Sequence, residues 1–412
     1  MRRHTLLLVM VGSVAGLGLL ALFETLGGKN PSAKASRRDA EFAVTNPADR
    51  GPGTLREAIF AANFAAARVR IVFLVPRLTL RTPLPPVVHR GGIEIVAADS
   101  AAEIDAQALA TGAVLDLQAP GALVERLRIR GAGGIGILVR APGVRLVDVS
   151  LAGCGIGVEQ AAGAEGLEVE QGSFIENAVG ARLQAGDAGT AIRRSSFRGH
   201  REAALWAVGP ATGPAPGGLT VSDSWFENDR LGLVVGNLTA TIQDNDIRGS
   251  AVAGVYLTGR GVTLRRNRVR AGAGIGVLAA LTEGAVITDN EIDHNQAVGI
   301  VVSSGLNTLV QQNRIYQNGY GIVVVFGAGR SPTKVAGNSV LDQSLDGLFV
   351  VGASPILERN RAMNNRAAGM RILDFMPQGG GAALPADPLL VRNVLEGNGV
   401  NEPVHGVFRD PG

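Results

Sequence analysis

Short runs of alternating apolar and polar residues recur along this chain at a nearly constant spacing, with polar turns between them. In the second half one asparagine marks each repeat, and the successive steps are 22, 23, 23, 25 and 22 residues, at Asn245, Asn267, Asn290, Asn313, Asn338 and Asn360. Eight or nine residues later comes a glycine followed by an apolar residue, as in Gly254–Val255. This period is too short for a pair of helices and predicts a solenoid in which each repeat is one coil of three short parallel strands.

Stacked coils place equivalent residues above one another at the strand spacing of about 4.8 Å. The repeated asparagine is therefore expected to bond to its copies in neighbouring coils as a ladder. A second, partial series precedes the glycines by three or four residues, and we attribute it to turn bonding: Asn177, Asn228, Asn295, Asn318 and Asn365. The sequence predicts an all-β, right-handed parallel β-helix of about a dozen coils over residues 67–412, with handedness from the rule for parallel crossovers.

Departures from the period are expected to form loops on one face of a solenoid. The main insertions are residues 210–218, 327–332 and 374–388. Each follows the strand that opens with glycine and an apolar residue, so the three loops are predicted to lie along the same side.

Composition narrows the class of protein. Glycine supplies 57 of the 412 residues, aromatic residues are 4% and apolar residues 46%, which excludes a disordered chain, and the glycines lack the period of three of collagen. Residues 1–38 hold six basic residues against one acidic residue, which leaves 33 basic and 35 acidic residues in the rest. A neutral body argues against nucleic acid as a partner. The single cysteine, Cys154, is expected to pack as a small apolar side chain.

The N-terminus has the pattern of a targeting segment. Arg2 and Arg3 precede an uncharged stretch, residues 5–23, which is long enough to span a bilayer. A small-residue cleavage site at Ala33–Ala35 lies further from that stretch than is usual. We interpret residues 1–38 as a signal anchor, or a cleaved signal peptide, plus a linker. The body is then exported, either periplasmic and anchored to the inner membrane or secreted.

Residues 39–66 are predicted to form an N-terminal cap. Thr54 and Glu57 have the spacing of a capping box, and an apolar helical face follows at Leu55, Ala58, Ile59 and Ala62. The stretch TLREAIFAAN resembles the opening of exported right-handed parallel β-helix proteins of the pectate-lyase-like superfold. The resemblance extends through the coil pattern over most of residues 42–410 and implies that the helix covers the open N-terminal end. That superfold hosts lyases, hydrolases, epimerases and adhesins, so it indicates fold rather than activity.

In pectate-lyase-like enzymes the active site lies on the outward residues of the strand that the insertions follow. Here the outward residues are predicted to be Gly157, Arg182, Trp206, Val234, Tyr256, Leu278, Val301, Val323, Phe349 and Arg371. No carboxylate, histidine or lysine lies between Arg182 and Arg371 in this series, and the paired carboxylates and catalytic motifs of the family are absent from the sequence. Asp374, at the start of the longest insertion, is the candidate catalytic acid or base.

Charged residues flank the ladder asparagines and mostly alternate in sign between coils, which predicts a solvated ladder of ion pairs. The alternative is a calcium site built from Asp244, Asp246, Asp289, Glu291 and Asp293, although Arg266, Arg268 and Arg270 would neutralise it. His294 and His405 lack partners at metal-ligand spacing. We therefore expect no metal and no cofactor.

Two functions remain open. The first is an exported protein that binds or modifies a polysaccharide along its groove, with Trp206, Tyr256 and Phe349 as stacking platforms and Arg182 and Arg371 near the ends. An enzyme of this kind would be a polysaccharide lyase, hydrolase or epimerase. The alternative is a non-catalytic surface or periplasmic scaffold, or an adhesin, that docks a protein partner through its apolar stripe. A metal-donating maturation protein would need metal contacts that the sequence does not display.

Overall fold

The computed structural model describes residues 39–409 apart from 185–188, 210–216, 328–331 and 378–381. The predictions made for residues 1–38 lie outside these described residues. Within the described part, no helix has the length and apolar character needed to cross a bilayer.

The described chain consists mainly of short strands joined by turns, and the strands belong to three parallel sheets of 15, 14 and 13 strands, which we call sheets A, B and C. Sheet A contains β1 (Ala40–Val44), β2 (Val69–Phe73), β4 (Ile93–Ala97), β7 (Leu123–Glu125), β10 (Arg145–Val147), β13 (Glu168–Glu170), β16 (Thr190–Arg193), β19 (Leu219–Ser222), β22 (Ala240–Gln243), β25 (Val262–Arg265), β28 (Val286–Thr288), β31 (Leu309–Gln311), β34 (Lys334–Ala336), β37 (Ile356–Glu358) and β40 (Leu389–Val391). Sheet B contains β3 (Arg77–Thr79), β5 (Ala102–Asp105), β8 (Leu127–Arg130), β11 (Ser150–Ala152), β14 (Ser173–Ile175), β17 (Ser196–Arg198), β20 (Trp225–Glu227), β23 (Asp246–Arg248), β26 (Arg268–Arg270), β29 (Glu291–Asp293), β32 (Arg314–Tyr316), β35 (Ser339–Leu341), β38 (Arg361–Met363) and β41 (Val394–Glu396). Sheet C contains β6 (Ala113–Leu117), β9 (Ile135–Val139), β12 (Ile156–Gln160), β15 (Val179–Leu183), β18 (Ala203–Val208), β21 (Leu231–Gly236), β24 (Ala253–Arg260), β27 (Ile275–Glu283), β30 (Val298–Ser303), β33 (Tyr320–Val325), β36 (Leu348–Val351), β39 (Met370–Met376) and β42 (Val404–Arg409).

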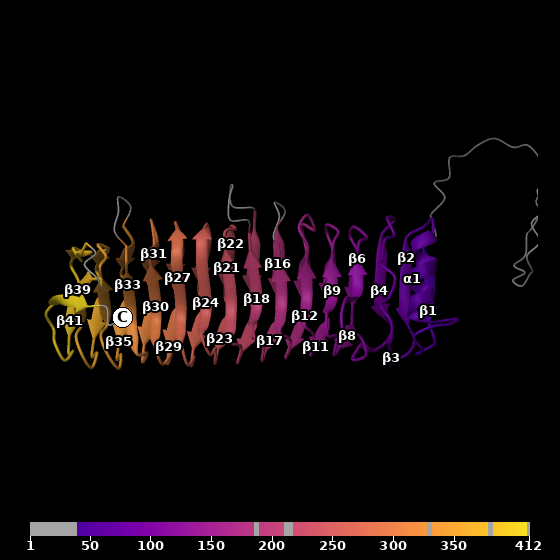
Figure 1. The fold of residues 1–412 in the computed structure, drawn as a ribbon, viewed down its shortest axis with the longest axis horizontal. Helices are drawn as coiled ribbons and strands as arrows, with labels where there is room; N and C mark the ends of the chain where they lie inside the picture. Colours follow the sequence, from indigo (N-terminus) through magenta and orange to yellow (C-terminus); the bar gives the residue numbers. More distant parts are fainter. Residues whose placement is uncertain (1–38, 185–188, 210–216, 328–331, 378–381, 410–412) are drawn as a thin grey trace, which may run out of the picture. The chain divides into compact units, whose positions relative to one another are not determined.

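The chain visits the sheets in turn, so that neighbouring strands within each sheet come from successive coils (Figure 1). The full coils are about as many as the 13 strands of sheet C. The predicted parallel β-solenoid of about a dozen coils is therefore confirmed.

The core is built from columns of inward residues in register. In sheet A, Ile242, Leu264, Ile287, Val310 and Val335 pair in sequence, and each is fully buried. In sheet B, the rings of Phe174, Phe197 and Phe226 stack with centroids 4.4 and 4.8 Å apart. Like side chains above like explains why the apolar pattern repeats with the coil.

The predicted asparagine ladder is present. From Asn245 to Asn360 each backbone N–H donates to the side-chain oxygen of the next asparagine, and Asn393 continues the column. The attribution of the second series to local turn bonding was incomplete. These residues also form a buried ladder between coils, through Asn295, Asn318, Gln343, Asn365 and Asn398. Asn228 lies outside it, and the neighbouring Asp229 takes the ladder position below His200.

Close approach between coils explains the glycine of each repeat. A Cβ on Gly254 would lie 2.8 Å from the carbonyl oxygen of Gly276 and 2.6 Å from Cγ1 of Val269. A side chain at this position would therefore separate consecutive coils.

The helix α1 (Leu55–Phe64) covers the N-terminal end of the solenoid, as predicted (Figure 1). The Thr54 side chain accepts from the Glu57 N–H at 3.4 Å, and Glu57 accepts in return from the backbone N–H of Gly53 at 2.5 Å. Leu55 and Ile59 are among the buried residues of the helix. The segment predicted as cap also supplies β1, which pairs with β2, so α1 takes the place that strands of sheets B and C hold in later coils.

Candidate functional site

The outer face of sheet C carries the predicted column of outward residues. Its members pair in unbroken succession, at Arg182, Trp206, Val234, Tyr256, Leu278, Val301, Val323, Phe349 and Arg371. We call this column the sheet C stripe. The three insertions follow β18, β33 and β39, all in sheet C, as expected, although the centres of these loops lie outside the described residues.

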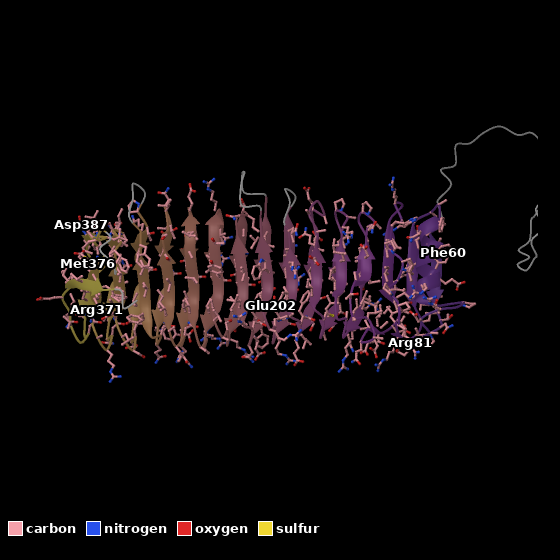
Figure 2. All side chains as sticks on the ribbon, in the orientation of Figure 1. Phe60, Arg81, Glu202, Arg371, Met376 and Asp387 are labelled. Carbon is pink, nitrogen blue, oxygen red and sulfur yellow. The ribbon has the colours of Figure 1, made fainter. Side chains whose placement is uncertain are left out.

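The prediction was wrong at Gly157. The residue that pairs with Arg182 is Glu159, whereas Gly157 lies one position before Val158, which pairs with Ala181. Two glycines near this turn, Gly155 and Gly157, fit the motif, and counting from the first shifted the expected column by two residues. Beyond Arg182, at the end of the solenoid away from Arg371 (Figure 2), the column continues through Glu159, Leu138 and Asp116 and so carries two carboxylates.

The middle of the stripe is uncharged. The Trp206 side chain is the most open of the predicted stacking residues, with 39% of its surface exposed, and Tyr256, Leu278, Val301 and Phe349 are half-buried. Val234 and Val323, which were also predicted to face outward, are buried. Tyr320, from the neighbouring column, stacks on Phe349 with ring centroids 5.4 Å apart and planes inclined by 17°. Trp206 and Tyr256 are two coils apart, about 10 Å. The stripe thus offers apolar surface at Trp206, Tyr256, Leu278, Val301 and Phe349, with interruptions at Val234 and Val323.

The two predicted arginines at the ends of the stripe are both paired. The guanidinium of Arg371 donates to both carboxylate oxygens of Asp346, at 2.8 and 3.1 Å, and Asp346 is almost fully buried. This hydrogen bond raises the pKa of Arg371 above its ordinary value. Arg182 lies 3.5 Å from Glu159. Both arginines are thus held in place by carboxylates that sequence reasoning had not assigned to them.

Asp374 lies inside β39 rather than at the start of a loop. Its Oδ1 accepts from the N–H of Ala386 at 2.8 Å, and Phe375 pairs with Leu384 in both directions. These bonds fasten the two ends of the longest insertion together. Asp374 is on the same strand as Arg371 but five coils, about 24 Å, from the coil of Tyr256.

The carboxylates of the alternative calcium site lie on sheet B and its preceding turn, among arginines. Arg266 pairs with Asp244 at 2.8 Å, and Arg270 with Asp246 at 2.7 Å. The bond to Arg266 is the main reason that the pKa of Asp244 is lowered. In the part of the chain that the structure describes, no group of three or more His, Cys, Asp or Glu side chains is placed to hold a metal. The face acts as an ion-pair ladder.

His200, in the turn between β17 and β18, is buried. Its Nδ1 lies 2.7 Å from Oδ1 of Asp229, which also accepts from the backbone N–H of His200. The side chains are 0% and 1% exposed, so this pair replaces one rung of the second ladder and is closed to a substrate. The signal was present in the sequence, since His200 stands four residues before Ala204 as the ladder asparagines stand before their glycines.

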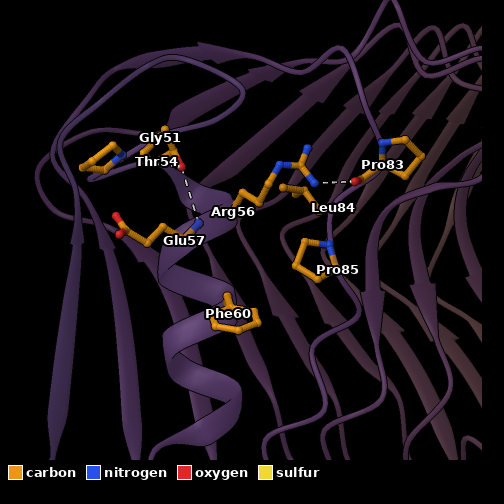
Figure 3. Close-up of a pocket in the computed structure, with 9 residues that line it drawn as sticks. Gly51, Thr54, Arg56, Glu57, Phe60, Pro83, Leu84 and Pro85 are labelled. Carbon is orange, nitrogen blue, oxygen red and sulfur yellow. Dashed lines mark hydrogen bonds between the residues drawn. The ribbon is translucent and has the colours of Figure 1, made fainter. Parts of the chain in front are cut away.

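A hollow of about 650 Å³ lies beside the capping helix, between Phe60 and residues 83–85 (Figure 3). Arg56 crosses it and donates to the carbonyl oxygen of Pro83 at 2.6 Å and to Asp49 at 2.8 Å. The guanidinium is thus committed to holding the cap to the first coils. None of the predicted site residues lines this hollow.

Comparison with known proteins identifies the class. Residues 215–362 match the family model described as "Right handed beta helix region". This part of the chain is therefore a right-handed β-helix. A comparison with curated protein sequences finds no match.

Solved structures with the same fold share little sequence with this chain. The Azotobacter vinelandii mannuronan C-5 epimerase AlgE6 A-module is 13% identical, covers 87% of this chain and 94% of its own, and has a TM-score of 0.53. A mutant of the periplasmic alginate epimerase AlgG is 15% identical over 75% of this chain and 83% of that chain, with a TM-score of 0.50. The Dettilon tailspike protein gp208 is 13% identical over 86% and 64%, with a TM-score of 0.50. These likenesses concern the fold.

Proposed function

We propose that this chain is an exported β-helix protein that binds a polysaccharide along the sheet C stripe. The observation that carries the proposal is the register-stacked row with Trp206, Tyr256 and Phe349 on one uncharged face. Aromatic rings present flat apolar faces at low cost in conformational entropy, which suits the apolar faces of sugar rings. The likeness in fold to two alginate epimerases adds support.

The stripe favours binding over chemistry. A general acid or base must lie within hydrogen-bond reach of the substrate, and between Arg182 and Arg371 the stripe offers no carboxylate, histidine or lysine among the described residues, only the hydroxyl of Tyr256. A lyase, hydrolase or epimerase activity would therefore have to use one end of the stripe. Asp374 and Arg371 share β39 at the C-terminal end, and Glu159 and Asp116 extend the column at the N-terminal end. Asp374 would first have to release the N–H of Ala386.

The proposal includes the placement of the protein. Residues 1–38 would act as a signal anchor, or a cleaved signal peptide, with a linker, and residues 39–66 and 67–412 as the exported cap and β-helix. The arginines at positions 2 and 3, followed by the uncharged residues 5–23, support this orientation.

A second candidate is a non-catalytic scaffold or adhesin that docks a protein partner. The half-buried aliphatic centre of the stripe, Leu278 and Val301, favours it, because contiguous apolar surface is typical of interfaces.

Tryptophan fluorescence can test the glycan proposal. Trp225 lies on sheet B under the guanidinium of Arg248, so a Trp225→Phe background leaves Trp206 as the reporter. Titration of the full chain with neutral and acidic oligosaccharides should give a saturable change with at least one of them. Tyr256→Ala should weaken that binding about tenfold, the cost of one stacking platform at the upper end of aromatic pair energies.

The matched control is Phe64→Ala, an exposed aromatic residue on the cap, which should leave the titration unchanged. An absence of response to every oligosaccharide would contradict glycan binding. Capture of a defined protein partner that is lost in Val301→Asp would then support the scaffold.

A further inference from the structure

The ion-pair column on sheet B breaks at one coil. Asp246, Arg268, Glu291 and Arg314 pair in sequence and alternate in sign. The next residue is Ser339, followed by Arg361. A carboxylate at the position of Ser339 would continue the alternation. Because the residue is a serine, it is flanked by two arginines, which lie two strand spacings, or about 10 Å, from each other.

Both arginines keep their charge uncompensated. Within the described residues neither Arg314 nor Arg361 has a carboxylate oxygen within 4.0 Å, and both are exposed. Arg314 lies over the ring of Tyr316, with Cζ 4.9 Å from the centroid, and Arg361 contacts the sulfur of Met363 at 3.5 Å. Glu291, the expected partner of Arg314, accepts from the Tyr316 hydroxyl at 2.6 Å instead.

A hollow of about 440 Å³ lies in the same three coils, on the sheet A side of the turns that lead to Arg314, Ser339 and Arg361, and these three residues do not line it. It is lined by Leu309, Gln311, Gln312, Lys334, Ala336, Gly337, Glu358 and Arg359. Gly337, two residues before Ser339, adds no side chain to the lining, and the nearest atom to a Cβ there would be Cγ of Gln312 at 4.0 Å.

The charge of the hollow is also positive. Glu358 is its one acidic lining residue, and Lys334 lies 2.7 Å and Arg359 3.6 Å from it. The bond to Lys334 is the main reason that the pKa of Glu358 is lowered, so this carboxylate stays ionised and paired. Two cations against one anion, together with the two free arginines beyond the turn, make this surface attractive to anions.

We propose that the hollow and the arginine pair form one binding site for an acidic sugar unit. The oxyanion of the sugar, a carboxylate, sulfate or phosphate, would lie above the Ser339 hydroxyl between Arg314 and Arg361. The sugar ring would fill the hollow beside the amides of Gln311 and Gln312. Arginine forks bind planar and tetrahedral oxyanions through paired charge-assisted hydrogen bonds. The site lies on sheets A and B and is independent of the sheet C stripe.

Calorimetric titration of the full chain in detergent with hexagalacturonate tests the proposal, and its carboxyl-reduced neutral counterpart is the ligand control. Arg314→Gln and Arg361→Gln should each weaken binding of the acidic hexamer about tenfold, as the loss of a hydrogen bond to a charged group implies. Ser339→Glu restores the alternation of charge and should abolish binding while the thermal midpoint is kept or raised. Arg145→Gln, an exposed arginine 3.3 Å from Glu168, should change nothing.

Further arms separate the sources of the oxyanion. A sulfated heparin hexasaccharide and inorganic phosphate are titrated in the same way, and the tightest ligand identifies the preferred group. Tyr256→Ala on the stripe should leave all of these titrations unchanged. The proposal is overturned if none of the three probes binds, or if the probes bind equally to the parent chain and to folded Arg314→Gln and Ser339→Glu variants.

Discussion

Replacing one ladder asparagine should destabilise the solenoid strongly. The side-chain amide of Asn290 donates to the carbonyl oxygens of Leu264 and Thr288 at 3.0 and 2.9 Å and to Oδ1 of Asn313 at 2.9 Å. Its oxygen accepts from the backbone and side-chain nitrogens of Asn267 at 2.9 and 3.1 Å. Asn290→Ala removes all five bonds and leaves the buried Asn267 N–H without an acceptor. At about 1 kcal/mol for each bond, the free energy of unfolding should fall by about 3–5 kcal/mol.

Denaturant unfolding of the body measures this loss, and amide hydrogen exchange locates it. The Asn267 N–H should exchange faster, because a solenoid transmits disturbance mainly to neighbouring coils. Gln296→Ala is the control, since that exposed amide lies in the coil of Asn290 and its loss should cost less than about 0.5 kcal/mol. An Asn290→Ala variant as stable as the control would refute the ladder as a source of stability.

Three further outcomes are expected. Leu55→Asp with Ile59→Asp should lower the melting temperature or cause end-to-end association, because both side chains are buried against the first coil, whereas Phe64→Asp, at a 77% exposed position, should not. Burial raises the pKa of the Cys154 thiol from 9.0 to about 11, so the free energy of unfolding should fall as the pH rises from about 9 to 11. A chromogenic disulfide reagent should react with this thiol only after unfolding. Equal reaction rates in the folded and unfolded states would contradict its burial. The lowered pKa of Asp244 contributes stability that is lost as the pH falls below 3.8, and Arg266→Gln should reduce that acid dependence of the melting temperature; an unchanged slope would contradict the pairing.

The parts of the fold that repeat could be predicted from the sequence. The spacing of Asn245 to Asn360 required only counting, because identical side chains in stacked coils satisfy one another. The capping helix could likewise be predicted from Thr54, Glu57 and the apolar face that follows, because residues a few positions apart determine where a helix begins.

The candidate site was predicted less completely, because its details depend on irregular coils. The outward position in the coil of Gly157 was predicted two residues too early, because either Gly155 or Gly157 could have been the glycine of the repeat. Glu159 was missed as a result. The partner of Arg371 was also missed. Asp346 lies 25 residues earlier and faces this arginine only because β39 stacks beside β36.

The sequence by itself determined the coil period, the inward and outward alternation, the ladder and the cap, because these follow from local spacing and from repetition. Only the tertiary structure decided which charges are neutralised. In the sequence, Arg371 and Arg314 are both arginines within short predicted strands. In the structure, a buried carboxylate binds Arg371, whereas Arg314 lies over the ring of Tyr316 and has no such partner. That difference depends on distances of a few ångströms between side chains from different coils. It also depends on the partner of each carboxylate, since Asp346 bonds Arg371 whereas Glu291 bonds the Tyr316 hydroxyl.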